Sequence, residues 1–179
     1  MTKREWSAMA NEAASTVLFQ NILFKFDNGE TREVDGLAAA VLMRASPVFC
    51  KMLTHDMREK VCREIELPGK EATELEVLMK FLMPESARQQ KLSDATVGFL
   101  WKWSEEYMID CLKDECVQFV RTAKASKNIL IAAQEMNLET RAAECVDTLL
   151  AFGVRDWKDC YGNHAVMQTL VECAMKKLR

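Results

Sequence analysis

The side chains that could carry out covalent or metal chemistry are few and scattered. Seven cysteines occur, but only two histidines, His55 and His164. Cys50, His55 and Asp56 could supply a thiol nucleophile, a base and an orienting carboxylate, the set that covalent catalysis requires. No known local pattern supports that combination, and the chain contains no phosphate-binding loop, dinucleotide-binding glycine motif or G-x-S-x-G turn. We therefore expect no enzyme and no catalytic residue.

The cysteines are better explained as small apolar residues. Their number is odd and no C-x-x-C pair is present, whereas a Cys/His zinc site needs clustered ligands. Cys111 and Cys116 are five residues apart, so they do not share a helix face. We expect reduced thiols in a reducing compartment, with no metal and no cofactor. A thiol-redox protein, which would need a cysteine of lowered pKa, is the least favoured alternative.

Composition excludes further classes. The net charge of -3 and the pI of about 5.6 do not fit a nucleic-acid-binding domain, which would be basic. No apolar run reaches the roughly 18 residues of a membrane span, and no signal-peptide core follows the charged start. We therefore expect no membrane partner and a cytoplasmic and/or nuclear location. The 179 residues suggest one domain with a helical extension.

The start of the chain predicts a helix followed by a β-hairpin. In residues 4–16, Trp6 and Met9 are spaced for one helix face. Trp6 either docks onto its own domain or is buried in a partner subunit, and the sequence favours neither. Residues 17–26 then alternate as a strand, and an Asp-Asn-Gly turn leads into a second strand over 30–34.

Two short helices and a third strand follow. Residues 37–43 form an apolar helix, and Ser46 with Pro47 is a typical N-cap and first helical residue of the next helix. Residues 63–67 alternate again as a strand that ends at a Pro-Gly pair.

Every later pattern is helical. Thr73 and Glu76 predict a capping box, a polar loop covers 84–93, and Gly153 predicts a helix end. The predicted helices cover residues 73–83, 97–104, 109–120, 128–136, 139–151 and 164–178.

Three features of these helices allow alternatives. Trp101 is predicted in the core, and Trp103, two residues on, is either core or an exposed partner contact. Trp157 is expected to staple the last helix onto the preceding ones. The apolar stripe of helix 164–178 is expected to be core rather than a binding surface.

The segment 42–59 carries a family signature. It reads L-M-R-A-S-P-V-F-C-K-M-L-T-H-D-M-R-E and resembles the centre of BTB/POZ domains, typically L-A-A-R-S-P-V-F-x-x-M-F followed by M-x-E. Residues 65–68 resemble the strand that follows, and 107–113 (Y-M-I-D-C-L-K) resemble the family's Y-x-I-x-x-L-K step. The resemblance covers about residues 15–122. The helical pair at 126–151 resembles the 3-box of cullin-3 adaptors of the speckle-type POZ class.

The resemblance implies an α+β fold. This is the BTB/POZ fold, a small β-sheet flanked by a cluster of α-helices, followed by an all-α C-terminal extension. The implied organisation is an N-terminal helix over 1–16, a BTB/POZ domain over 17–122 and a 3-box/BACK-like helical extension over 123–179.

The resemblance also implies a function, which is protein–protein interaction. The family's hydrophobic-x-Glu motif, which contacts the cullin-3 N-terminal domain, matches Met57, Arg58 and Glu59, and Tyr107 matches an aromatic beside that surface. The implied role is a substrate adaptor or scaffold of a cullin-3 RING ubiquitin ligase, with an unknown substrate protein. The implied cullin-binding residues are Met52, Leu53, His55, Met57, Arg58, Glu59 and Tyr107.

Self-association, as a homodimer, is the other implied interaction. The charged pocket common in the family is replaced here by Asn21 and the pair Ala38 and Ala39, which argues against a corepressor role and weakly against an ordinary dimer. A BTB scaffold that oligomerises without recruiting a ligase is therefore the alternative function. The residues expected to serve self-association are Trp6, Met9, Ala38, Ala39, Val41 and Leu42.

Overall fold

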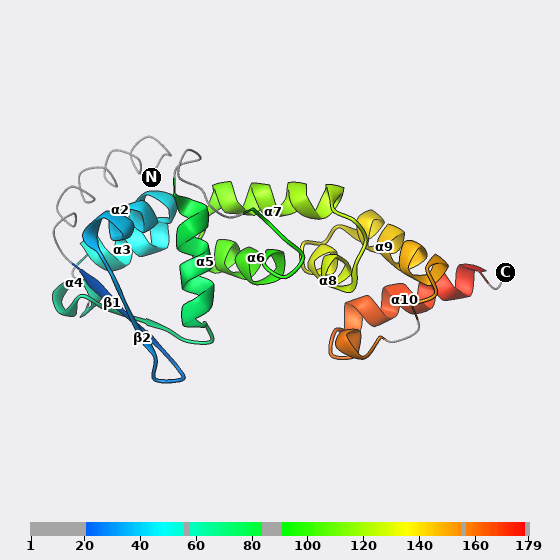
Figure 1. Ribbon diagram of the computed structural model, residues 1–179, viewed down its shortest axis with the longest axis horizontal. Helices are drawn as coiled ribbons and strands as arrows, with labels where there is room; N and C mark the ends of the chain where they lie inside the picture. The colour runs from blue at the N-terminus through cyan, green and yellow to red at the C-terminus, as the bar shows by residue number, and fades with distance from the viewer. Residues whose placement is uncertain (1–20, 56–57, 84–90, 155–156, 178–179) are drawn as a thin grey trace. The chain divides into compact units, whose positions relative to one another are not determined.

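A computed structural model describes residues 21–55, 58–83, 91–154 and 157–177 of the chain (Figure 1). The predicted helix over 4–16 and most of the loop over 84–93 lie outside the described residues. The contacts divide the chain into two compact units. The first contains the described residues up to Lys91 together with Lys102–Lys113, and the second contains Leu92–Trp101 and the described residues from Asp114 onward.

Three strands form one sheet in the first unit: β1 (Ile22–Phe26), β2 (Thr31–Val34) and β3 (Glu64–Leu67). The order is β2-β1-β3, with β1 antiparallel to β2 and parallel to β3. Ile22, Phe24 and Phe26 are buried and alternate with half-buried residues, because successive side chains of a strand point to opposite faces. The predicted hairpin and third strand are confirmed.

The hairpin turn is tied to the end of β3. Gly29 has a φ of 80°, a left-handed conformation that glycine adopts without a steric penalty. The Asp27 carboxylate accepts a hydrogen bond of 2.7 Å from the Gly69 N–H, so the Asp-Asn-Gly turn and the Pro-Gly turn stabilise each other.

Among the described residues, six helices belong to the first unit or contribute residues to both units: α2 (Gly36–Ala45), α3 (Pro47–Thr54), α4 (Arg58–Cys62), α5 (Ala72–Leu82), α6 (Val97–Glu106) and α7 (Asp110–Thr122). Helix α2 packs against α3 and α5. Asp35 caps α2 by accepting the Ala38 N–H at 2.8 Å, and Ser46 caps α3 as predicted. Helix α4 was not predicted, because its five residues carry no apolar periodicity.

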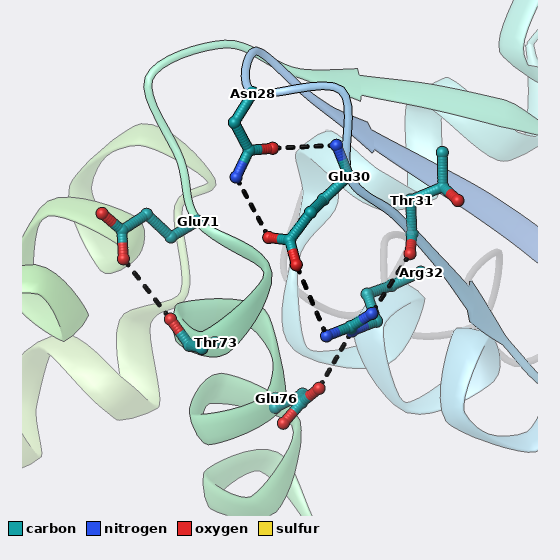
Figure 2. A network of polar contacts seen from close by, with 7 residues as sticks. All are labelled: Asn28, Glu30, Thr31, Arg32, Glu71, Thr73 and Glu76. Atoms are coloured by element: carbon teal, nitrogen blue, oxygen red, sulfur yellow. Dashed lines mark hydrogen bonds and ion pairs between the residues drawn. The ribbon is translucent and has the colours of Figure 1, made fainter.

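The capping box at the start of α5 is two residues earlier than the predicted one. The prediction of Thr73 and Glu76 is wrong, since Glu71 is the N-cap and the carboxylate of Glu74 reaches back to the Glu71 N–H at 3.5 Å. Ala72 is fully buried, so packing draws the helix start toward the core. Thr73 instead donates its hydroxyl proton to the Glu71 carboxylate, as Figure 2 shows.

A surface network joins the hairpin to α5 (Figure 2). Arg32 contacts the carboxylate of Glu76 at 3.0 Å and that of Glu30 at 3.8 Å, and Asn28 hydrogen bonds to the Glu30 carboxylate and backbone. Both arginine pairs are about half exposed. We expect each pair to contribute less than about 1 kcal/mol to stability. This network therefore stabilises the fold only slightly and does not form a functional site.

The second unit adds four elements to its parts of α6 and α7: α8 (Lys127–Glu135), α9 (Glu139–Ala151), the 3₁₀ turn η2 (Lys158–Cys160) and α10 (His164–Lys177). Ser126 caps α8 by accepting the Ile129 N–H at 3.2 Å. Helix α9 ends before Gly153, whose φ of 73° confirms the predicted stop. Helix α10 packs against α8 and α9.

The structure decides one open alternative about buried residues and corrects one prediction. Trp103 is fully buried and its indole N–H donates to the Glu74 carboxylate at 2.9 Å, so the exposed-contact alternative is wrong. In α10 the buried residues are Val166 and Cys173, whereas Val171, which belongs to the predicted core stripe, is 56% exposed. The stripe is wider than the face that α8 and α9 cover. Trp101 and Trp157 are buried, as predicted.

Candidate functional site

Helix α3 is held at its first residue by a group far away in the sequence. The Ser46 hydroxyl oxygen accepts the Phe49 N–H at 3.1 Å, and the same hydroxyl donates to the Tyr107 carbonyl at 2.5 Å. Ser46 is fully buried. One side chain therefore caps α3 and latches it to the corner between α6 and α7.

An aromatic stack fixes the same corner. The rings of Phe49 and Tyr107 are parallel with centroids 4.5 Å apart, and Trp103 lies 5.1 Å from Tyr107. The Lys70 ammonium lies 5.6 Å from the Trp103 ring and pairs with the Glu106 carboxylate. Such contacts add to the apolar burial of the rings. Burial, followed by the charge of Glu106 and a hydrogen bond to it, raises the pKa of Tyr107 above its ordinary value.

The residues implied to bind the cullin do not all reach the surface. His55 and Arg58 are exposed, and Met52 and Glu59 are half-buried. Leu53 and Tyr107 are each only 3% exposed. In the free domain the side chains of Leu53 and Tyr107 therefore pack beneath the surface. Met57 lies outside the described residues.

Helix α4 forms part of this surface and has few stabilising contacts. None of its residues is buried, and Val61 is 80% exposed. Arg58 pairs with Glu66 of β3 at 3.5 Å, but both side chains are about two-thirds exposed, so the pair contributes little. A five-residue helix is far below the length at which helices are stable alone. Its stability therefore comes from its contacts with α3 and β3.

The turn from α4 into β3 contains a strained arginine. Arg63 has a φ of 56°, and the left-handed conformation is unfavourable by roughly 1–2 kcal/mol for a residue with a Cβ. Its Nη1 atom is buried and has no hydrogen-bond partner. No sequence pattern predicted this, because an arginine between a polar stretch and a strand looks like an ordinary surface residue.

The residues expected to serve self-association lie on or around α2. Ala39 and Leu42 are fully buried, while Ala38 and Val41 are half-buried. The sequence prediction missed Leu37, which is 61% exposed and lies four residues before Val41 on the same helix face. That i, i+4 apolar pair was the available signal. Trp6 and Met9 lie outside the described residues.

Asn21, which stands where the resemblance implies an aspartate, directly precedes β1. The Asn21 amide donates to the Glu33 carboxylate at 2.8 Å, on the surface of the hairpin. It therefore forms a local contact within the hairpin.

One arginine ties α9 to the end of α7. The Arg141 guanidinium donates to the Val120 carbonyl at 2.9 Å and to the Ala123 carbonyl, which are free acceptors at the end of α7. An open pocket of about 520 Å³ lies beside it. Its lining residues are Arg121, Asn137, Leu138, Glu139, Thr140, Arg141 and Glu144. The pocket mixes two cations with two carboxylates, so it has no preference for one sign of charge.

The thiols have the properties of core residues. Cys50, Cys116 and Cys145 are buried, and burial raises the pKa of each thiol, that of Cys116 to about 12. Among the described residues no three His, Cys, Asp or Glu side chains come together as metal ligands. None of the described helices is long and apolar enough to span a membrane.

Comparison with known proteins identifies the domain that these elements form. No curated protein is found to match the chain. The family model of the BTB/POZ domain matches residues 38–124, from α2 to just beyond α7. The small sheet, the helical cluster and the helices that follow agree with the predicted α+β fold. The chain therefore contains a BTB/POZ domain, a protein–protein interaction module, over residues 38–124, followed by a helical extension.

Proposed function

We propose that the chain is a substrate adaptor or scaffold of a cullin-3 RING ubiquitin ligase and carries out no chemistry itself. The observation that supports this is the surface at the end of α3 and on α4. It presents His55 at the end of α3, a helix whose start is latched by Ser46, and Arg58, Glu59 and the exposed Val61 on α4. A rigid helix end beside a sparsely anchored helix is suited to docking a partner helix.

In this role the protein raises the local concentration of a substrate near the ligase. Glu59 supplies a carboxylate that accepts hydrogen bonds from the cullin, and Met57 supplies a flexible apolar anchor. Helices α8 and α9 correspond to the 3-box that the sequence resemblance implies. The substrate binds elsewhere on the chain or on a partner subunit, in the cytoplasm or the nucleus.

The test is calorimetric titration of the full chain with a cullin-3 N-terminal domain. We expect sub-micromolar binding by the wild type and a loss of about tenfold or more, about 1.4 kcal/mol, in the Met57→Ala, Glu59→Ala double variant. Glu76→Ala is the matched control, because it removes an exposed carboxylate on α5. Absence of binding by the wild type would reject the adaptor role.

A self-associating scaffold is the second candidate, and Leu37 is the observation that favours it. An exposed leucine beside the half-buried Val41 gives α2 an apolar strip, which a second copy could cover. A dimeric mass in solution that becomes monomeric in Leu37→Ser, without cullin affinity in either protein, would select the scaffold over the adaptor.

A further inference from the structure

Helix α2 is apolar on the side that faces solvent as well as on the side that faces the core. Arg44 is the one charged residue among its ten. Its inner side packs against α3 and α5, whereas its outer side carries Leu37, 61% exposed, and the half-buried Val41, bordered by the half-buried Ala38 and Ala45. A helix that is apolar all round is normally buried on both sides. The described residues therefore leave this apolar strip of α2 without a cover.

The described part of the chain begins beside the strip. The antiparallel register of β1 and β2, continued by one pair, sets Asn21 opposite Asp35, the N-cap of α2. The residues before Asn21 therefore join the fold next to the first turn of α2. Residues 17–20 can span at most about 13 Å, so the end of the predicted helix over 4–16 is held within reach of the strip.

The predicted helix and the strip match in length and direction. Trp6, Met9 and Ala13 form the apolar stripe of the segment, and Trp6 and Ala13 are about 10 Å apart along a helix. Leu37 and Ala45 are about 12 Å apart along α2. Because the segment joins the fold at the start of α2, it would lie antiparallel to α2, with Ala13 nearest Leu37 and Trp6 nearest Ala45.

The charges agree with this direction. Glu5 precedes Trp6 in the segment, so an antiparallel arrangement brings its carboxylate to the end of the strip at which Arg44 is exposed. An exposed pair of this kind adds little stability, but it favours one orientation over the reverse.

The tether favours the chain's own segment over a second copy as the occupant. A linker as short as residues 17–20 holds the segment at an effective concentration on the order of millimolar. A second copy of the chain would have to approach that concentration to displace it.

We propose that the apolar strip of α2 is the docking site of segment 4–16 of the same chain, which lies on it as an antiparallel helix with Trp6 as its anchor. Tryptophan supplies the largest apolar area of the segment. This inference decides how Trp6 is buried and is independent of the proposed cullin contact.

The test is amide hydrogen exchange of the full chain, followed by mass spectrometry on peptides that cover residues 4–16. A free helix of this length is only marginally stable in water, so slow exchange in the segment reports docking. We expect exchange at least about tenfold slower than in a synthetic peptide of residues 1–20. We expect Leu37→Ser and Trp6→Ala each to bring the rate to within about threefold of that of the peptide.

Phe152→Ser is the matched control, because Phe152 is a large apolar residue, 76% exposed, in the second unit. We expect its segment 4–16 to exchange as slowly as in the wild type. Fast exchange in the wild type, or slow exchange that survives both Leu37→Ser and Trp6→Ala, would overturn the inference.

Dilution separates the chain's own segment from a second copy. We expect the exchange rate of the segment to stay constant on dilution, in a protein whose mass by light scattering is that of the 20.4 kDa monomer. A dimer whose dissociation on dilution speeds exchange in the segment would mean that a second copy provides the cover. That result would reject docking within one chain and favour the self-associating scaffold.

Discussion

The two units of the chain differ in the interactions that stabilise each of them internally. In the first, polar side chains connect segments far apart in the sequence, as in the bonds from Ser46 to Tyr107 and from Trp103 to Glu74. In the second, the side-chain bonds from Arg141 to Val120 and from Gln134 to Thr169 are only partly buried, and Cys116, Cys145, Cys160 and Cys173 are buried. A directional bond out of reach of water fixes a geometry more closely than one that water can replace. The unit with the fully buried Ser46 latch is thus the one better suited to hold a fixed partner surface.

The cysteines make this difference testable by native thiol labelling. Cys62 and Cys111, both in the first unit, are exposed, whereas all four cysteines of the second unit are buried. We expect the two exposed thiols to react first, and the buried four to react slower by on the order of a thousandfold or more, because they need unfolding to open. Burial raises the pKa of Cys116 to about 12, so this thiol stays protonated and unreactive at neutral pH.

Mass spectrometry of labelled peptides identifies which thiols have reacted, and a sample in denaturant provides the control in which all seven react. Fast labelling of Cys145 or Cys173 in the native protein would mean that the second unit opens readily, and its apolar packing would then be looser than its burial indicates.

Ser46→Ala tests the long-range latch. This change removes the N-cap of α3 and leaves the buried Tyr107 carbonyl without its donor. We expect the free energy of unfolding to fall by about 2–3 kcal/mol, measured by chemical denaturation.

Ser126→Ala is the matched control for Ser46→Ala, since Ser126 caps α8 through the Ile129 N–H and its hydroxyl serves no distant carbonyl among the described residues. We expect a loss of about 1 kcal/mol there. Equal losses in the two variants would show that the bond to Tyr107 contributes nothing beyond the cap.

Arg141→Ala tests a polar clamp of the second unit. The side chain is only 17% exposed and serves two carbonyls at the end of α7. We expect a loss of about 1–2 kcal/mol, less than for Ser46→Ala, because water reaches part of this site and replaces some of the lost bonds. The comparison variant is Arg121→Ala, an exposed arginine, for which a change within about 0.5 kcal/mol is expected. A larger loss at Arg141 than at Ser46 would reverse the contrast between the units.

Most elements of this fold could be read from local patterns. The alternation of Ile22, Phe24 and Phe26, the Ser-Pro start of α3 and the glycine that ends α9 each act within a few residues, so a single stretch of sequence is enough to identify them. The prediction of a BTB/POZ domain is confirmed over residues 38–124. The implied cullin contacts and the domain boundaries stay predictions.

The features that decide the candidate site depended on residues far apart in the chain. Tertiary packing buried Trp103 against Glu74 and moved the start of α5 to Ala72. It also left Val61 exposed on an unpredicted helix and set Arg63 in a left-handed turn between that helix and β3. The sequence alone determined the order and kind of most elements, because propensity, periodicity and capping are local. Only the folded chain decided which side chains are exposed and which lack a partner, because burial is set by neighbours from distant segments.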